Sequence, residues 1–344
     1  MVPCAAGIDG SGHVPLAHLR GSIMDEALRG MGFGPNLGSE AIRPLHRRLD
    51  ATDPAIFRRP DAAGHPDVRT RRHHVTVHLD LDAYFHRIRW GGHTRPTYET
   101  LAQLVRAHMR YIPFENLDVL LGRGIRIDLE SVQDKLVRAR RGGYCFEHAT
   151  LFAAVLERLG FQPVRHSSRV ILLSPRAEAP RTHMFLTVPL PEGTFVVDPG
   201  FGALAPRVPV PLVDGQEASI DGERHWMVRD EGRWILRAQV RSDTPVDAWV
   251  ITLEEDYPID FEMANHYTST YPASPFKNRI LMRSLTDEGR VTVMNRDATI
   301  WRADTPHRFE LEDRRALRGL LVEYFGIDLP EVEHMRVPGI PEWA

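Results

Sequence analysis

The most reactive side chain in the sequence is the thiol of Cys145, which lies in the run RGGYCFE at residues 141–147. An apolar segment with helical periodicity follows it directly. A thiol in the first turn of a helix has its thiolate stabilised by the helix dipole and by unpaired backbone N–H groups. Free cysteine is also among the most buried residue types, so this residue taken alone is more simply explained as core packing. The second cysteine, Cys4, lies in a polar N-terminal segment.

A histidine and an aspartate downstream change that interpretation. A thiol nucleophile needs a base, and the base needs an acceptor that holds its tautomer. His183 opens a predicted strand and Asp198 ends the next one. If the two strands pair as a hairpin, both side chains lie at its open end. A strand histidine and an aspartate before Pro-Gly also have ordinary structural explanations, but their order and predicted adjacency favour a Cys–His–Asp arrangement.

The elements predicted to position these residues are helices up to about residue 160 and mainly strands after it. Helical periodicity marks residues 81–88 and 101–109, a segment capped by Asp128, and the segment from Cys145 to a stop at Gly160. Period-two patterns then predict six strands, at residues 168–173, 183–188, 194–198, 225–228, 234–237 and 249–253. Several short strands with turn signals favour a small antiparallel barrel or sandwich. Residues 280–284 and 290–294 predict further strands, and 313–325 an amphipathic helix.

Composition and charge bear on the partners of the protein and on its compartment. The chain has 344 residues and a formal net charge of −3, which does not favour nucleic acid or an anionic membrane as a partner. Two cysteines cannot form a disulfide framework, so we expect a cytoplasmic protein. The basic residues are almost all arginine, with Lys135 and Lys277 the two exceptions. Genome composition explains that bias most simply, although arginine is also the better bidentate ligand for phosphate.

The first 74 residues form a leader rich in Gly, Pro, Arg and His, and we expect it to be disordered apart from a short helix near residues 23–31. The pair His73-His74 has no partner at ligand spacing, so we predict no metal site.

Four motifs, in order, resemble those of the arylamine N-acetyltransferases. They are IPFENL at 112–117, RRGGYCFE at 140–147, RTH at 181–183 and VDPGFG at 197–202. The separations from Cys145 to His183 (183 − 145 = 38) and from His183 to Asp198 (198 − 183 = 15) also resemble the family's. The resemblance runs from about residue 78 to the C-terminus.

The resemblance implies a fold class and a domain plan. The fold is α+β, with a helical domain carrying the nucleophile (75–160), an antiparallel β-barrel carrying the histidine and aspartate (161–275) and an α/β lid (276–344). This is a cysteine-proteinase or transglutaminase-like core, here preceded by the leader at 1–74. The segment boundaries agree with the periodicity described above.

The resemblance also implies the roles of individual residues. Cys145 would accept an acetyl group from acetyl-CoA, His183 would act as its base, and Asp198 would orient His183. An arylamine or arylhydrazine would then attack the thioester, in a ping-pong reaction without a metal. Phe201 matches the aromatic residue beside the acceptor amine, and Thr182 falls where CoA approaches.

Two further residue sets bear on the site. Glu115 and Arg141 are expected to form a buried structural pair that supports the thiol loop. Many relatives carry Gln-Asn where this chain has His148-Ala149. On a helix His148 would lie roughly on the face of Cys145, but His183 carries the family motif and is the preferred base.

Three alternatives remain open at this point. An amide synthase that closes macrolactam rings on polyketides would use the same triad with a carrier-bound acyl chain. A transglutaminase-like thiol hydrolase shares the Cys–His–Asp order and would not need CoA. A non-enzymatic scaffold is disfavoured because the triad is intact. The sequence does not identify the physiological amine, the preferred acyl donor, the oligomeric state or the role of the leader.

Overall fold

A computed structural model describes residues 78–344 except 173, 241–243, 288 and 303–304. The expectations for the leader, including the helix near 23–31, lie outside these residues. The described helices are α2 (Leu81–Arg87), α3 (Tyr98–Tyr111), α4 (Leu117–Leu120), α5 (Leu129–Gln133), α6 (Cys145–Arg158), α7 (Pro258–Thr270), α8 (Pro275–Asn278) and α9 (Arg314–Leu320). The strands are β1 (Val164–Val170), β2 (Arg181–Leu190), β3 (Gly193–Val197), β4 (Val210–Pro211), β5 (Glu217–Ile220), β6 (Glu223–Asp230), β7 (Arg233–Gln239), β8 (Val246–Ile251), β9 (Leu281–Leu285), β10 (Gly289–Met294), β11 (Asp297–Arg302) and β12 (Thr305–Glu310).

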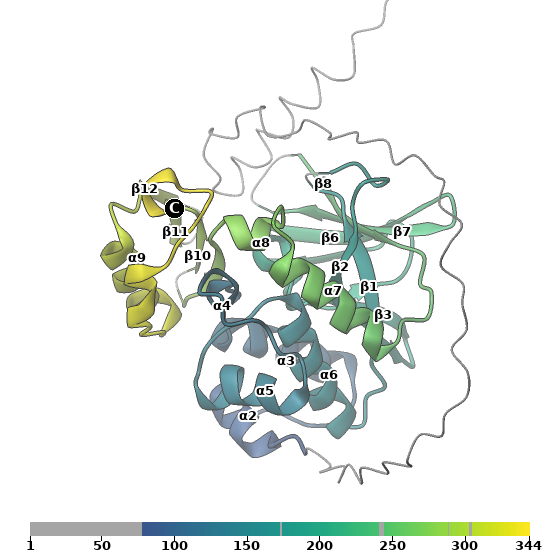
Figure 1. The fold of residues 1–344 in the computed structure, drawn as a ribbon. Coiled ribbons are helices and arrows are strands. Elements are labelled where there is room, and N and C mark those ends of the chain that lie inside the picture. The colour runs from purple at the N-terminus through teal and green to yellow at the C-terminus, as the bar shows by residue number, and fades with distance from the viewer. Residues whose placement is uncertain (1–77, 173, 241–243, 288, 303–304) are drawn as a thin grey trace, which may run out of the picture. The chain divides into compact units, whose positions relative to one another are not determined.

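Helices α2, α3, α5 and α6 lie together, in blue in Figure 1, and share one hydrophobic core. Helix α3 begins where the Thr97 hydroxyl accepts a hydrogen bond from the Thr100 amide at 3.3 Å. Leu101, Leu104 and Val105 are buried on its inner face. Because α6 is buried along most of its length, it forms the centre of this layer and holds Cys145 at its first residue.

The central sheet is antiparallel, with eight described strands in the order β4-β3-β2-β1-β8-β7-β6-β5. Its two ends approach each other, since the amide of Gly215, just after β4, donates to the carbonyl of Met227 in β6 at 2.8 Å. The sheet is therefore a nearly closed barrel. Strands β6 and β7 are joined by a two-residue hairpin turn, in which Glu231 and Gly232 both have positive φ as such a turn requires.

The last part of the chain forms a smaller antiparallel sheet in the order β12-β11-β10-β9, which packs with α9 over its own core. The predicted helix at 313–325 is present. It consists of α9 followed by a π-helical turn, Leu321–Phe325, and ends at Gly326. Gly326 has φ +65°, the left-handed conformation that glycine adopts without strain.

The expectation of mixed helix and sheet with a central antiparallel barrel is confirmed. The predicted strands are present, with ends shifted by at most four residues. The pattern analysis did not predict the helices α4, α7 and α8 or the strands β4, β5, β11 and β12. Among these, α7 matters most for the site, because it contacts β2 and its Phe261 lies in the same core as Cys145. Figure 1 shows α7 crossing in front of the barrel strands.

Candidate active site

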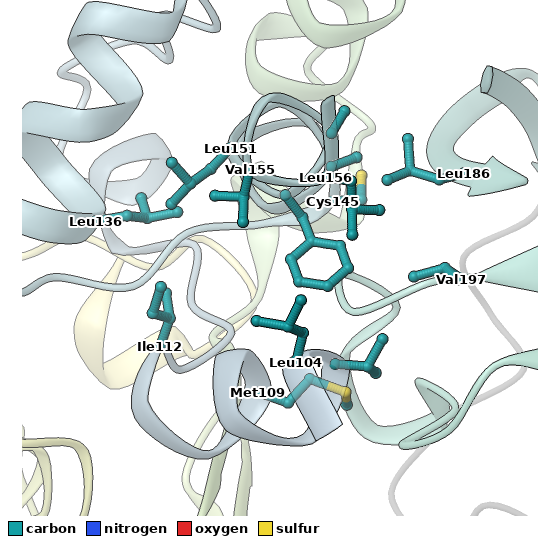
Figure 2. Close-up of a cluster of buried hydrophobic side chains, with 14 of the residues drawn as sticks. Leu104, Met109, Ile112, Leu136, Cys145, Leu151, Val155, Leu156, Leu186 and Val197 are labelled. Atoms are coloured by element: carbon teal, nitrogen blue, oxygen red, sulfur yellow. The ribbon is translucent and has the colours of Figure 1, made fainter. Parts of the chain in front are cut away.

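Cys145 is the first residue of α6 and is 3% exposed. Figure 2 shows its side chain at the part of the core that faces Leu186 of β2 and Val197 of β3. Its sulfur lies 3.9 Å from the backbone carbonyl oxygen of Thr182. The thiol is therefore at the contact between the helix and the strands, where helix-terminal N–H groups are available.

His183 and Asp198 meet as the hairpin prediction required. In the β2–β3 pair Leu186 lies opposite Val197, which brings His183 and Asp198 together beyond the paired residues. The Nε2–H of His183 donates to Oδ2 of Asp198 at 2.8 Å. The two side chains are 3% and 0% exposed. This bond holds the imidazole in one orientation and leaves Nδ1 for the thiol.

The histidine is held in its charged form. Burial by itself lowers the pKa of His183, but the Asp198 carboxylate and the hydrogen bond with the Cys145 side chain outweigh burial and raise that pKa to about 10. The three side chains therefore form one buried proton-sharing unit.

Trp249 is a fourth member of this unit that the sequence analysis did not find. Its indole Nε1–H donates to the same Oδ2 of Asp198 at 3.0 Å. Its ring stacks on Phe185 with a centroid separation of 4.2 Å. Asp198 therefore accepts hydrogen bonds from two side chains, His183 on β2 and Trp249 on β8. Strand β1 lies between these two strands in the sheet.

The turn after Asp198 lies directly against the thiol helix. A Cβ on Gly200 would lie 2.6 Å from the Cα of Cys145 and 3.2 Å from both the Cys145 carbonyl oxygen and the Cβ of His148. Carbon atoms do not approach that closely without displacement. Glycine at this position therefore lets the turn that carries Asp198 approach Cys145.

Two side chains expected in substrate contacts lie beside the triad. The Phe201 ring is half-buried and packs edge-on against His183, with centroids 4.7 Å apart. Thr182 is half-buried, and its backbone carbonyl contacts the thiol, while its hydroxyl donates to the Pro180 carbonyl at 3.5 Å. The structure therefore places both near the reactive atoms; their substrate roles stay predictions.

A buried charge network supports the loop before Cys145. The predicted pair is confirmed, with Arg141 Nη2 2.7 Å from Glu115 Oε1. Lys135 extends it, because its Nζ lies 2.8 Å from Glu147 Oε1 and 2.9 Å from Asp118 Oδ2. Burial raises the pKa of Glu147, and Lys135 opposes that rise. The ammonium of Lys135 is a compact point charge, and it contacts both carboxylates.

Glu147 also caps the thiol helix. Its Oε2 accepts a hydrogen bond from the amide of Tyr144, the residue before Cys145, at 3.0 Å. The hydroxyl of Tyr144 in turn donates to Oδ1 of Asn265 in α7. The start of α6 is therefore tied both to the charge network and to a helix that the pattern analysis missed.

His148 does not approach the thiol as a second base. Its Nδ1 accepts from Nε2–H of His108 at 2.8 Å, and its own Nε2–H donates to the Pro113 carbonyl at 3.2 Å. The hydroxyl of Tyr84 donates to Nδ1 of His108 at 3.0 Å. Burial lowers the pKa of both histidines, that of His148 to about 4. The two histidines are therefore neutral, and with Tyr84 they form a chain of hydrogen bonds that joins α2, α3 and α6.

No group of three or more His, Cys, Asp or Glu side chains suited to a metal ion occurs among the residues that the structure describes. In the same part of the chain no helix is long and apolar enough to cross a membrane.

Known proteins are similar to this chain in both sequence and fold. A family model described as N-acetyltransferase matches residues 97–334, which include the whole triad. The arylamine N-acetyltransferase of Mycobacterium bovis is 39% identical over 262 residues, covering 74% of this chain and 91% of that protein. That of Escherichia coli is 35% identical over 258 residues, covering 74% and 91%.

The chain belongs to the arylamine N-acetyltransferase family. It is therefore an acyltransferase, and the family identification from the four motifs is confirmed. The arylamine N-acetyltransferase structure from M. tuberculosis superposes with a TM-score of 0.69 at 38% identity, covering 74% of this chain and 96% of that one. The Mycobacterium marinum arylamine N-acetyltransferase, solved in complex with CoA, gives 0.69 at 33% identity, covering 74% and 94%.

Proposed function

We propose that this arylamine N-acetyltransferase carries its acetyl group on Cys145, in a ping-pong reaction between acetyl-CoA and an arylamine or arylhydrazine. The observation that carries the proposal is the buried pair in which His183 donates to Asp198 at 2.8 Å, at the point where the Cys145 sulfur meets Thr182, the residue before His183. The CoA bound to the M. marinum relative supports acetyl-CoA as the donor. We place the reaction in the cytoplasm because the chain has too few cysteines for a disulfide framework.

In the first half-reaction the Cys145 sulfur attacks the acetyl carbonyl carbon. A bond forms between that carbon and Sγ, and the bond to the CoA sulfur breaks. The departing CoA sulfur takes the proton from Nδ1 of His183. Asp198 keeps the imidazole in the orientation that this transfer needs. The backbone N–H of Cys145, at the helix start, is our candidate donor to the oxyanion.

In the second half-reaction the amine nitrogen attacks the thioester carbon. A C–N bond forms, the bond to Sγ breaks, and the amine proton passes to Nδ1 of His183, which restores the starting ion pair. An aniline-type amine is largely neutral at pH 7, so its lone pair is available. Splitting one transfer into two thioester steps lowers each barrier. We propose Phe201 as the aromatic wall for the amine and Thr182 as a contact for CoA.

We further propose that residues 75–160, 161–275 and 276–344 act as a helical domain, a barrel domain and a lid around a cysteine-proteinase-like core. The support is that Cys145 belongs to the first segment and both His183 and Asp198 to the second, so that the reactive unit forms only where the two meet. The contact of α6 with β2 is the junction that this division requires.

The decisive experiment is a donor and acceptor panel in which release of CoA is followed with a thiol reagent. We expect acetyl-CoA to be consumed when an arylamine or arylhydrazine is present, and the enzyme alone to gain the mass of one acetyl group. Cys145→Ala should lose both signals while keeping its circular dichroism spectrum. Cys4→Ala is the matched control and should retain both. Turnover by Cys145→Ala would refute the thioester, and activity only with carrier-bound acyl chains would favour an amide synthase.

A further inference from the structure

A π-helical turn, η1 (Asp134–Arg138), lies directly before the loop that leads into α6. In this turn the amide of Ala139 donates to the carbonyl of Asp134, five residues earlier, at 2.8 Å. The loop is attached to the same turn, because the amide of Arg141 donates to the carbonyl of Lys135 at 3.0 Å. Turns of this type are rare and frequently occur at functional sites. The backbone of Lys135 therefore anchors the segment that ends at the thiol helix.

The side chain of Lys135 spans from this turn to the first turn of α6. Its Nζ lies 2.8 Å from Oε1 of Glu147 and 2.9 Å from Oδ2 of Asp118. The lysine side chain is 16% exposed and that of Glu147 is 2% exposed, so the contact is shielded from water. Salt screens ion pairs of this kind much less than it screens pairs at the surface. Lys135 therefore acts on Glu147 both by contact and by charge.

Glu147 uses its two carboxylate oxygens for different partners. Oε1 faces Lys135, whereas Oε2 accepts the amide of Tyr144, the residue before Cys145, at 3.0 Å. A Cβ on Gly143 would lie 2.7 Å from Oε2, so the glycine lets the carboxylate reach the backbone of the loop. A displacement of this carboxylate is therefore transmitted to the amide next to Cys145, at the helix end where N–H groups and the helix dipole favour a thiolate.

Lys135 is the cation that keeps Glu147 charged. The other charged or titratable side chains near this pair come from α4 and its flanking residues, from the loop and from α6, and they are Glu115, Asp118, Arg123, Arg141, Tyr144 and His148. Glu115 and Asp118 have arginine partners as well, at 2.7 and 3.3 Å. Among the described residues, Lys135 is the only cation within ion-pair distance of Glu147. Burial and Glu115 raise the pKa of Glu147, and Lys135 opposes both.

We propose that Lys135 is a positioning residue of the acetyl transfer proposed above. By holding the ionised Glu147 against the Tyr144 amide, it fixes the first turn of α6 and with it the Cys145 thiol. The inference rests on the proposed role of Cys145, and Lys135 acts on the thiol through Glu147 and Tyr144.

Removal of the lysine changes the charge of the group that caps α6. Glu147 then becomes a buried carboxylate without a cation, and such a group takes up a proton rather than remain charged. A neutral carboxyl accepts the Tyr144 amide more weakly, because charge-assisted hydrogen bonds are the stronger kind. The start of the helix is then held less firmly, and the thiol loses the fixed N–H groups around it.

The test combines alkylation of Cys145 by iodoacetamide with steady-state acetylation by the full-length enzyme, between about pH 5.5 and 8.5. We expect Lys135→Met to slow the alkylation and to lower kcat about tenfold, the effect of weakening one charge-assisted contact. The KM for acetyl-CoA should be unchanged, because the geometry of the thiol is altered and not the binding of substrate. The loss should be largest at the acid end and shrink as the pH rises, because Glu147 then regains its charge. Peptide mapping by mass spectrometry separates Cys145 from Cys4.

A second background keeps the test decisive if Lys135→Met does not fold. Glu147→Gln retains an acceptor for the Tyr144 amide and carries no charge, so it needs no cation. In this background Lys135→Met should cause little further loss of kcat and no pH-dependent loss. The double variant leaves neither charge of the pair unpartnered, so we expect it to fold. A further loss of about tenfold in this background would overturn the proposal, because the effect of Lys135 would then not pass through Glu147.

Lys277→Met is the matched control, because Lys277 is the other lysine of the chain and has no carboxylate partner among the described residues. It should match the parent in alkylation rate and in kcat. Equal alkylation rates for Lys135→Met and the parent over the whole pH range would overturn the proposal, as would a loss of the same size in Lys277→Met. If the parent forms no acetyl-enzyme, the thioester is refuted, whereas the alkylation rates still decide whether Lys135 positions the thiol.

Discussion

Replacing Gly200 by alanine should impair catalysis more than stability. The new methyl carbon would lie 2.6 Å from the Cα of Cys145, whereas ordinary contacts begin near 3.4 Å, so the turn or the helix must move by 0.8 Å (3.4 − 2.6). The nearest atoms belong to the Cys145 backbone, which cannot rotate away. Asp198 lies two residues before the substitution and Phe201 one after it, so the shift changes the geometry of the triad.

Overpacking of this size costs about 1–3 kcal/mol of folding free energy. A misplacement of about 1 Å at a catalytic group lowers the rate by roughly 100-fold, so we expect kcat/KM to fall about 10- to 100-fold in Gly200→Ala. The assay is steady-state acetylation of an arylamine, with stability measured by urea denaturation.

Gly319→Ala is the matched control for this substitution. A Cβ at Gly319 in α9 would meet no atom within 4 Å. Alanine there should leave activity unchanged and stabilise the helix by up to about 1 kcal/mol. If Gly200→Ala kept kcat/KM within twofold of the parent enzyme, the argument from close approach would be wrong.

The remaining predictions concern the groups around the thiol and the leader. Trp249→Phe keeps an aromatic ring but removes one donor to the triad aspartate, so kcat/KM should fall about tenfold; an unchanged value would show that the indole bond is dispensable. Iodoacetamide should label Cys145 rapidly at pH 7, and His183→Gln should slow this labelling, as followed by mass spectrometry; equal rates would contradict a thiolate maintained by the imidazolium. The folded-state pKa of His148, about 4, lies below its ordinary 6.5. The stability associated with neutral His148 is therefore complete above pH 6.5 and is lost as the pH falls towards 4. Urea midpoints between pH 7 and 4.5 should fall less steeply in His148→Gln than in the parent, and parallel profiles would contradict this. Deleting residues 1–74 should leave kcat/KM largely unchanged, and loss of activity or solubility would show that the leader belongs to the fold.

Sequence pattern predicted the hairpin that joins His183 and Asp198. Period-two alternation and the turn residues are local signals, and β2 and β3 are adjacent in the chain, so their pairing follows from short-range information. Helix α7 had no such signal. Ile259, Met263 and Tyr267 on its outer face are exposed, so apolar residues occur around the whole helix and no amphipathic stripe marks it.

The family, the candidate triad and the type of most elements could be predicted from the sequence, because motifs and periodicities are properties of neighbouring residues. Three contacts could not: the nitrogen of His183 that faces Asp198, the bond from Trp249 to this aspartate across 51 positions (249 − 198), and the contact of His148 with His108 instead of the thiol. These contacts depend on strand register and on helix packing across the core. Both are set by long-range burial, which no local pattern encodes.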